Sequence, residues 1–136
     1  MTGRERGSVA VELPLALGLL LLPLALFVIT VPAWPERQTV ARAAAIEASR
    51  SAVLAGSWEQ GVEEGEAAVR RAARNQGLDP SDISVSWAGS FSRGGSVTAS
   101  VTVRMPALVI PGLTTVEPWS WTADHTERVD DYRSIP

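Results

Sequence analysis

The strongest pattern in the chain is an apolar run, LPLALGLLLLPLALFVITVPA, that extends from Leu13 to Ala33 without a charged residue. As an α-helix, its 21 residues would span about 31 Å, which matches the hydrocarbon core of a bilayer. Apolar helices in soluble cores are shorter. The run therefore predicts a membrane-spanning helix at residues 8–34. Pro23 removes a backbone hydrogen bond to the Leu19 carbonyl and predicts a kink near the centre.

Two further helices are predicted where small and apolar residues recur at helical spacing. The first covers residues 38–56 and continues the membrane helix outward. The second covers residues 59–77, with Glu66 and Arg70 in the favourable i,i+4 order and Gly77 as its C-terminal cap. The expected buried positions are Val40, Ala44, Ala48 and Ala52 in the first helix, and Val62, Gly65, Val69 and Ala72 or Ala73 in the second.

The pattern then changes to period two, which is typical of strands with one buried face. Apolar residues alternate with polar or small ones over 83–88 and 97–105, on either side of an Arg-Gly-Gly turn, and this predicts a β-hairpin. A weaker alternation over 119–124 predicts a third strand. Prolines at 106, 111 and 118 predict that the segment between the second and third strands is a loop.

The predicted fold class is α+β. A transmembrane helix continues into an extracytoplasmic helix, followed by a second helix and a small three-stranded antiparallel sheet. One face of the sheet is apolar and needs the two helices to cover it. Its predicted members include Trp87, Val101, Val103, Trp119 and Trp121.

Charges at the two ends of the apolar run predict its orientation. Arg4 and Arg6 precede it and favour a cytoplasmic N-terminus, while Trp34 at the far end is typical of a membrane interface. A cleavable secretory signal has an apolar region of about 7–15 residues and a small-x-small cleavage site. Here the run is longer and the nearest candidate site contains a proline. A retained anchor is therefore expected, with residues 35–136 outside the cytoplasm.

The composition of the chain argues against several classes of function. The net charge is −3 and no basic block is present, which argues against a nucleic-acid binder. The chain has no cysteine and a single histidine, His125. There is no nucleophile elbow or phosphate-binding loop. Glu63, Glu64 and Glu66 are spaced unlike a calcium loop and are interpreted as a solvated helix face. We therefore expect no enzyme activity, no metal site and no cofactor.

Glu12 is the one carboxylate at the start of the apolar run. A charge at the edge of a spanning helix is costly and marks a functional candidate when a partner can be named. From this residue alone, two interpretations stay open. Glu12 is solvated in the headgroup layer, or it pairs with another charge.

The stretch from Gly7 to Glu12, behind a basic tail and ahead of the apolar run, resembles the class III leader of type IV-like prepilins. The resemblance implies that a prepilin peptidase cuts between Gly7 and Ser8, so that residues 1–7 form a cytoplasmic leader. Cleavage would create an α-amine on Ser8. Glu12 of one subunit would then pair with the Ser8 amine of its neighbour, and loss of either charge would leave the other unpaired at low dielectric.

The segment AAIEASR, which contains Glu47 and Arg50, resembles a stretch common in TadE-like proteins of tight-adherence pilus systems, and Thr122–Ser134 resembles their C-terminal end. Ile46 departs from the family pattern, which has arginine there. The resemblance implies a minor pilin or pseudopilin in the cytoplasmic membrane, partnered by a prepilin peptidase, the assembly platform and other pilins in a hetero-oligomer. The alternative is a single-pass anchored extracytoplasmic binding or adaptor domain that enters no filament.

Overall fold

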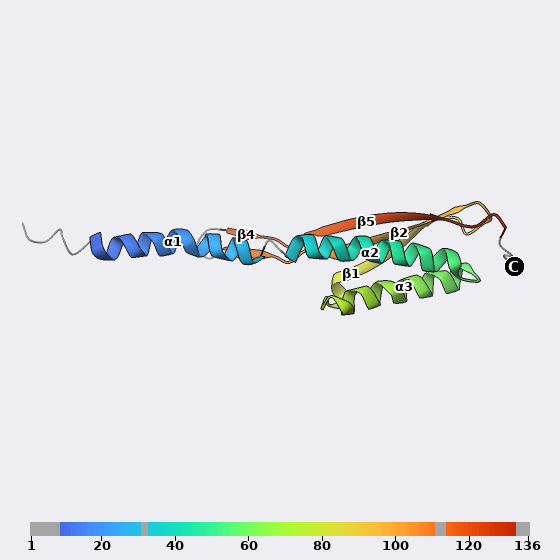
Figure 1. The fold of residues 1–136 in the computed structure, drawn as a ribbon, viewed down its shortest axis with the longest axis horizontal. Coiled ribbons are helices and arrows are strands. Elements are labelled where there is room, and N and C mark those ends of the chain that lie inside the picture. Colours follow the sequence, from blue (N-terminus) through green and yellow to red (C-terminus); the bar gives the residue numbers. More distant parts are fainter. Residues whose placement is uncertain (1–8, 31–32, 111–113, 133–136) are drawn as a thin grey trace, which may run out of the picture.

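The computed structural model describes residues 9–30, 33–110 and 114–132. Helices α1 (Val9–Thr30) and α2 (Ala33–Leu54) follow one another along the long axis of the molecule, and α3 (Trp58–Asn75) folds back beside α2 (Figure 1). All three predicted helices are confirmed, although α2 begins several residues earlier than expected. α1 is one helix through both Pro14 and Pro23, and the kink at Pro23 stays a prediction.

Three antiparallel strands form the main sheet in the order β1 (Ile83–Gly89), β2 (Ser96–Arg104) and β5 (Ser120–Arg128). The predicted hairpin is β1–β2, with Gly94 at its turn in the left-handed region at φ +70°. The predicted third strand is also present, but it continues to Arg128 instead of ending near residue 124. The longer strand pairs with β2 over its whole length.

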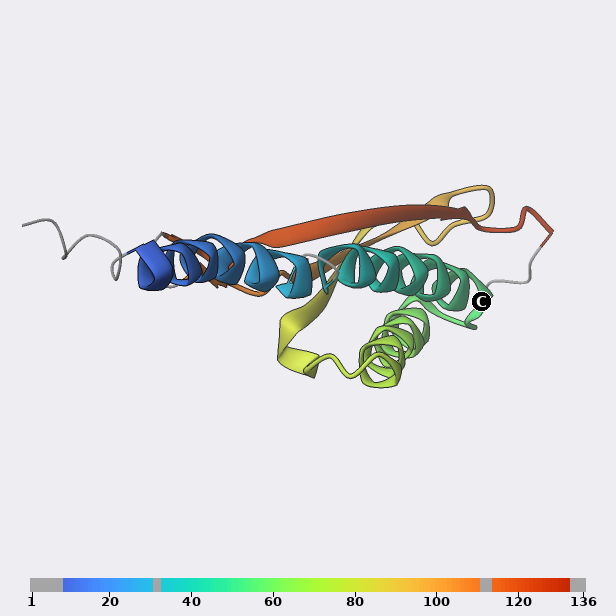
Figure 2. The same ribbon diagram turned by 60° about the vertical axis from the view of Figure 1, so that its left-hand side comes forward.

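The core lies between the sheet and helices α2 and α3. α2 packs against β2, β5 and α3, while α3 also packs against β1 (Figure 2). The predicted seam on α2 is buried, and alternate residues of β2 face it. The fully buried members of this core, none exposing any surface, include Ala44, Ala48, Val101, Val103 and Met105.

The two helices approach closely because α3 has glycines where it crosses α2. A Cβ on Gly61 would lie 2.8 Å from the Ala52 carbonyl oxygen. A Cβ on Gly65 would lie 2.4 Å from Cη2 of Trp87, whose ring fills the space between α3 and the sheet. Small residues on both helices therefore determine how near α3 lies to α2.

Both termini of α3 are capped, and the cap at its C-terminus is the predicted one. The Ser57 hydroxyl accepts a hydrogen bond from the Gln60 N–H at 3.2 Å. At the other end, Gly77 has φ +65°, and the Leu78 N–H reaches back to the Ala73 carbonyl at 2.9 Å. This is a Schellman motif, and it confirms Gly77 as the cap.

Asp79 caps the short 3-10 turn Pro80–Asp82 that leads into β1. Its carboxylate accepts hydrogen bonds from the N–H and the hydroxyl of Ser81 at 2.8 and 2.7 Å. These two bonds, the backbone one first, hold the pKa of Asp79 below its usual range.

The prediction of a loop between β2 and β5 is wrong. The segment contains an antiparallel ribbon, β3 (Leu108–Ile110) paired with β4 (Thr114–Val116). Pro106 and Pro118 lie outside both strands, so neither removes a hydrogen bond from the ladder, and Pro111 lies outside the described residues. The ribbon lies beside the second half of α1 (Figure 1) and contacts it through β3.

Candidate functional site

The surface of α1 is the first candidate site. Its large side chains are exposed around the whole helix, which is the pattern of a helix surrounded by lipid or by other apolar helices. Among the described residues, this is the one helical segment long and apolar enough to cross a membrane. The side chains that are at least two-thirds exposed are Val11, Leu15, Leu19, Leu20 and Ile29.

Glu12 lies in the first turn of α1 and its side chain is exposed. A carboxylate at this end of a helix interacts favourably with the helix dipole. Gly7 and Ser8, the predicted cleavage pair, lie outside the described residues. Cleavage, and the pairing of Glu12 with the Ser8 amine, therefore stay predictions.

One side of α1 is covered where the ribbon meets it. Of the side chains described on this helix, only Pro23 and Leu26 are half-buried. They lie three positions apart, so they share one face. On the ribbon, Leu108 is 4% exposed whereas its neighbour Val109 is 58% exposed. The ribbon therefore has one face toward α1 and one face away from it.

Two indoles meet where the ribbon joins the soluble part. Trp34, in the first turn of α2, and Trp119, just before β5, make an edge-to-face contact with centroids 6.2 Å apart. The Met105 N–H donates to the Trp119 carbonyl at 2.7 Å and closes the base of the ribbon. Trp119 had been predicted on the buried face of the third strand; it lies outside β5 and is 39% exposed.

Arg37 connects α2 to the sheet just above these indoles. Its guanidinium forms an ion pair with Asp82 at 3.1 Å and donates to the Arg104 carbonyl. The two side chains of the pair are only 19% and 28% exposed. No local pattern signals this contact, because the three residues are far apart in the chain.

Glu47 and Arg50, the residues that match the TadE-like stretch, lie exposed on α2. A pair between these two side chains is not among the ion pairs of the described residues. The predicted pair of Glu66 and Arg70 is confirmed, with 3.2 Å between Arg70 Nη1 and Glu66 Oε2. Arg50 instead lines an open groove of about 390 Å³ between α2 and β5, together with Val53, Leu54, Glu127, Arg128 and Asp130.

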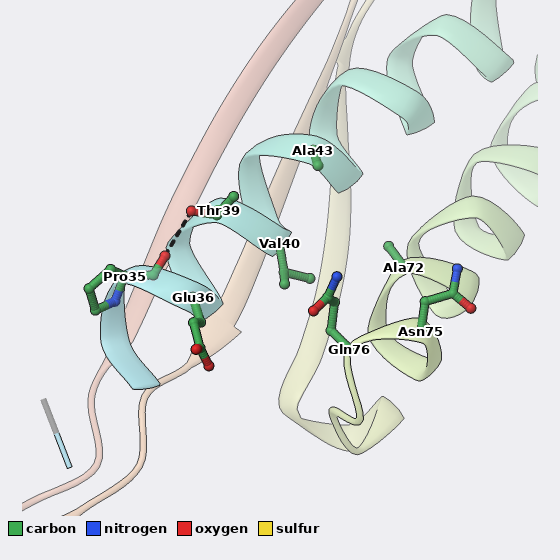
Figure 3. Close-up of a pocket in the computed structure, with 8 residues that line it drawn as sticks. All are labelled: Pro35, Glu36, Thr39, Val40, Ala43, Ala72, Asn75 and Gln76. Carbon is green, nitrogen blue, oxygen red and sulfur yellow. Dashed lines mark hydrogen bonds between the residues drawn. The ribbon is translucent and has the colours of Figure 1, made fainter. Parts of the chain in front are cut away.

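A second open groove, of about 410 Å³, lies between the first turns of α2 and the last turn of α3 (Figure 3). Glu36 is its one ionisable lining residue, and the Thr39 hydroxyl donates to the Pro35 carbonyl at 2.9 Å. Nothing in this lining pairs a nucleophile with a base. The remaining lining residues are Val40, Ala43, Ala72, Asn75 and Gln76.

His125 lies within β5, three residues before its end at Arg128. Its Nε2 is 3.3 Å from a carboxylate oxygen of Glu127, and both side chains are more than a third exposed. Within the described parts of the chain, no three His, Asp or Glu side chains gather as a metal site would require.

No protein-family model, curated protein or solved structure matches the chain. Its function must therefore be inferred from its own residues.

Proposed function

We propose that the chain is a minor pilin or pseudopilin similar to TadE, a non-enzymatic subunit of a tight-adherence or type IV-like pilus or secretion system. The observation that carries the proposal is Glu12 in the first turn of a long helix that is otherwise apolar on every side. Before assembly, α1 would anchor the subunit in the cytoplasmic membrane, with its N-terminus inside and the soluble part outside. After assembly, it would pack among the helices of other subunits.

The charge pair gives this packing a register. Cleavage between Gly7 and Ser8 would leave an α-amine four residues before Glu12. On a helix, four residues rise about 6 Å. A neighbour displaced axially by that distance would bring its amine level with Glu12, and both charges would be neutralised in the apolar bundle. A prepilin peptidase, an assembly platform and other pilins are the partners that this scheme requires.

The N-terminus of the mature chain tests cleavage. We expect mass spectrometry of the membrane-extracted protein to give a chain that begins at Ser8 when a prepilin peptidase is co-expressed, and the uncut chain without it. Gly7→Leu should block the cut, while Gly3→Leu serves as a matched control within the leader. A chain that starts at Met1 or Thr2 despite the peptidase would instead support the anchored adaptor domain.

Incorporation into filaments tests the charge pair. Glu12→Gln keeps the size of the side chain and removes its charge, so we expect the variant to be cut normally but to be depleted from purified filaments at least tenfold. Glu47→Gln removes an exposed charge from α2 and should assemble like the native chain. Normal incorporation of Glu12→Gln would contradict the pairing.

A further inference from the structure

The β3–β4 ribbon covers α1 near the centre of the apolar run. Pro23 and Leu26 are the half-buried residues among the described side chains of this helix, and β3 contacts it. On the ribbon, Leu108 is 4% exposed, yet it belongs to neither core cluster that the described residues of the soluble part form. Leu108 is therefore buried at the contact with α1. The ribbon occupies a face of the helix that lipid tails would meet in a membrane.

The backbone of the ribbon is not suited to lipid tails. In a two-stranded antiparallel ladder, alternate residues direct their N–H and C=O groups away from the partner strand. Among the described residues, β3 pairs with β4 alone, so these outer groups have no further strand beside them. Such groups are not tolerated where lipid tails surround them, and they need protein or water as a neighbour. A ribbon docked at Pro23 and Leu26 therefore excludes lipid tails from this height of α1.

The length of α1 makes the conflict quantitative. The uncharged part of the helix that precedes the covered face extends from Leu13 to Leu22, and its ten residues rise about 15 Å. The hydrocarbon core of a bilayer is about 30 Å thick. This part alone is thus about half as long as a membrane span. A bilayer-spanning α1 and a docked ribbon therefore exclude one another.

We propose that the β3–β4 ribbon is a strap that is open while α1 spans the bilayer and closes on Pro23 and Leu26 when α1 leaves the lipid for a bundle of neighbouring subunits. The arrangement described above is the closed state. This inference rests on the proposed function, because assembly is the step that takes α1 out of the lipid. In the closed state, the outer backbone groups of the ribbon meet protein and water in place of lipid tails.

The connections on either side of the ribbon allow this movement. The Met105 N–H donates to the Trp119 carbonyl at 2.7 Å, and Met105 is fully buried, so the base of the ribbon stays on the soluble part. Between this base and the ribbon, residues 106–107 and 117–118 belong to no strand. Residues 108–116 carry no charge, so closing buries none against α1. The strap therefore moves about its two short connections while the main sheet stays intact.

Pairs of introduced cysteines test the strap, because the chain has no native cysteine. Leu26→Cys is combined with Leu108→Cys in one chain and with Val116→Cys in another. Val116 lies opposite Leu108 in the ladder and shares its face, so the second pair keeps the buried leucine. The control combines Leu26→Cys with Leu22→Cys, four residues apart on α1, where the side chains are neighbours in every environment.

The reagent is dibromobimane, which enters membranes and bridges two thiols only when they are close together. Each full-length chain is treated in phosphatidylcholine vesicles and in purified filaments, and the bridged fraction is measured by mass spectrometry. Both test pairs are divided by the control pair in the same environment. Since the cysteine at position 26 is common to all three chains, the ratio removes the effect of lipid on its reactivity.

We expect the ratio for both test pairs to be at least fivefold higher in filaments than in vesicles. Equal ratios in the two environments would overturn the strap, because the ribbon would then be either docked in lipid or undocked in the filament. A chain that bridges the control pair in vesicles but enters no filament would overturn the proposed function, and the strap with it. The two failures are distinguishable, because the first is measured by bridging and the second by incorporation.

Discussion

Replacing Gly65 with alanine tests how α3 packs on the rest of the soluble part. The new Cβ would lie 2.4 Å from Cη2 of Trp87 and 3.1 Å from the Ala48 carbonyl oxygen. Carbon atoms in contact are about 3.5–4.0 Å apart, so the indole must move by about 1 Å. Overpacking of this kind costs about 1–3 kcal/mol, and alanine returns about 1 kcal/mol of helix propensity. Since the overlap is large, we expect a net loss of about 1–2 kcal/mol.

The assay is thermal unfolding of the full chain in detergent micelles, followed by tryptophan fluorescence. For a domain of this size, the loss corresponds to a fall in Tm of roughly 5–15 °C. The control is Gly18→Ala, the same change on α1, where the added methyl meets nothing within 4 Å. It should not lower the Tm, because alanine adds helix propensity there without a steric overlap. A Gly65→Ala chain that unfolds at or above the native temperature would refute the packing described for Trp87.

Three further changes have definite expected outcomes. Gly77→Ala should lower stability by about 1 kcal/mol in urea titrations, because its φ of +65° strains any residue with a Cβ; an unchanged midpoint would contradict the Schellman cap. In the same titrations, Arg37→Ala should lower the free energy of unfolding by about 1–2 kcal/mol, since its ion pair with Asp82 is only partly exposed. Arg70→Ala breaks an exposed ion pair and should lower it by at most about 0.5 kcal/mol. Asp79→Asn should lower the free energy of unfolding at neutral pH. Because the folded-state pKa of Asp79 is depressed, the difference in stability between the native chain and the variant should fade as pH falls below about 4. A stability difference that does not change with pH would exclude a role for the charge of Asp79.

Most of the soluble fold could be predicted because its elements repeat a simple pattern. Alternation in β1 and β2 marked both the strands and the buried face, and the four-residue spacing from Val40 to Ala52 marked the face of α2 that packs. Gly77 was recognisable because glycine is favoured where a helix ends in the left-handed region. These signals are local, so no knowledge of the tertiary structure was needed.

The missed features depend on contacts between distant residues. The strands of the ribbon are only three residues long, too short for an alternation to be distinguished from a loop. The Trp34–Trp119 contact and the bonds of Arg37 join segments that only the folded chain brings together. Glu12 was found from sequence because a lone charge beside an apolar run is itself a local signal.

The alignment of the elements has a mechanical consequence. α1, α2, β2 and β5 all extend along the long axis of the molecule (Figure 1). Tension applied to α1 therefore acts parallel to the strands, while the hydrogen bonds between antiparallel strands lie perpendicular to them. Such a load shears the β2–β5 ladder, so the registered pairs from Ser96–Arg128 to Arg104–Ser120 resist together and do not open one at a time. As a subunit of the filament proposed above, the chain would carry such a load along the whole β2–β5 pair.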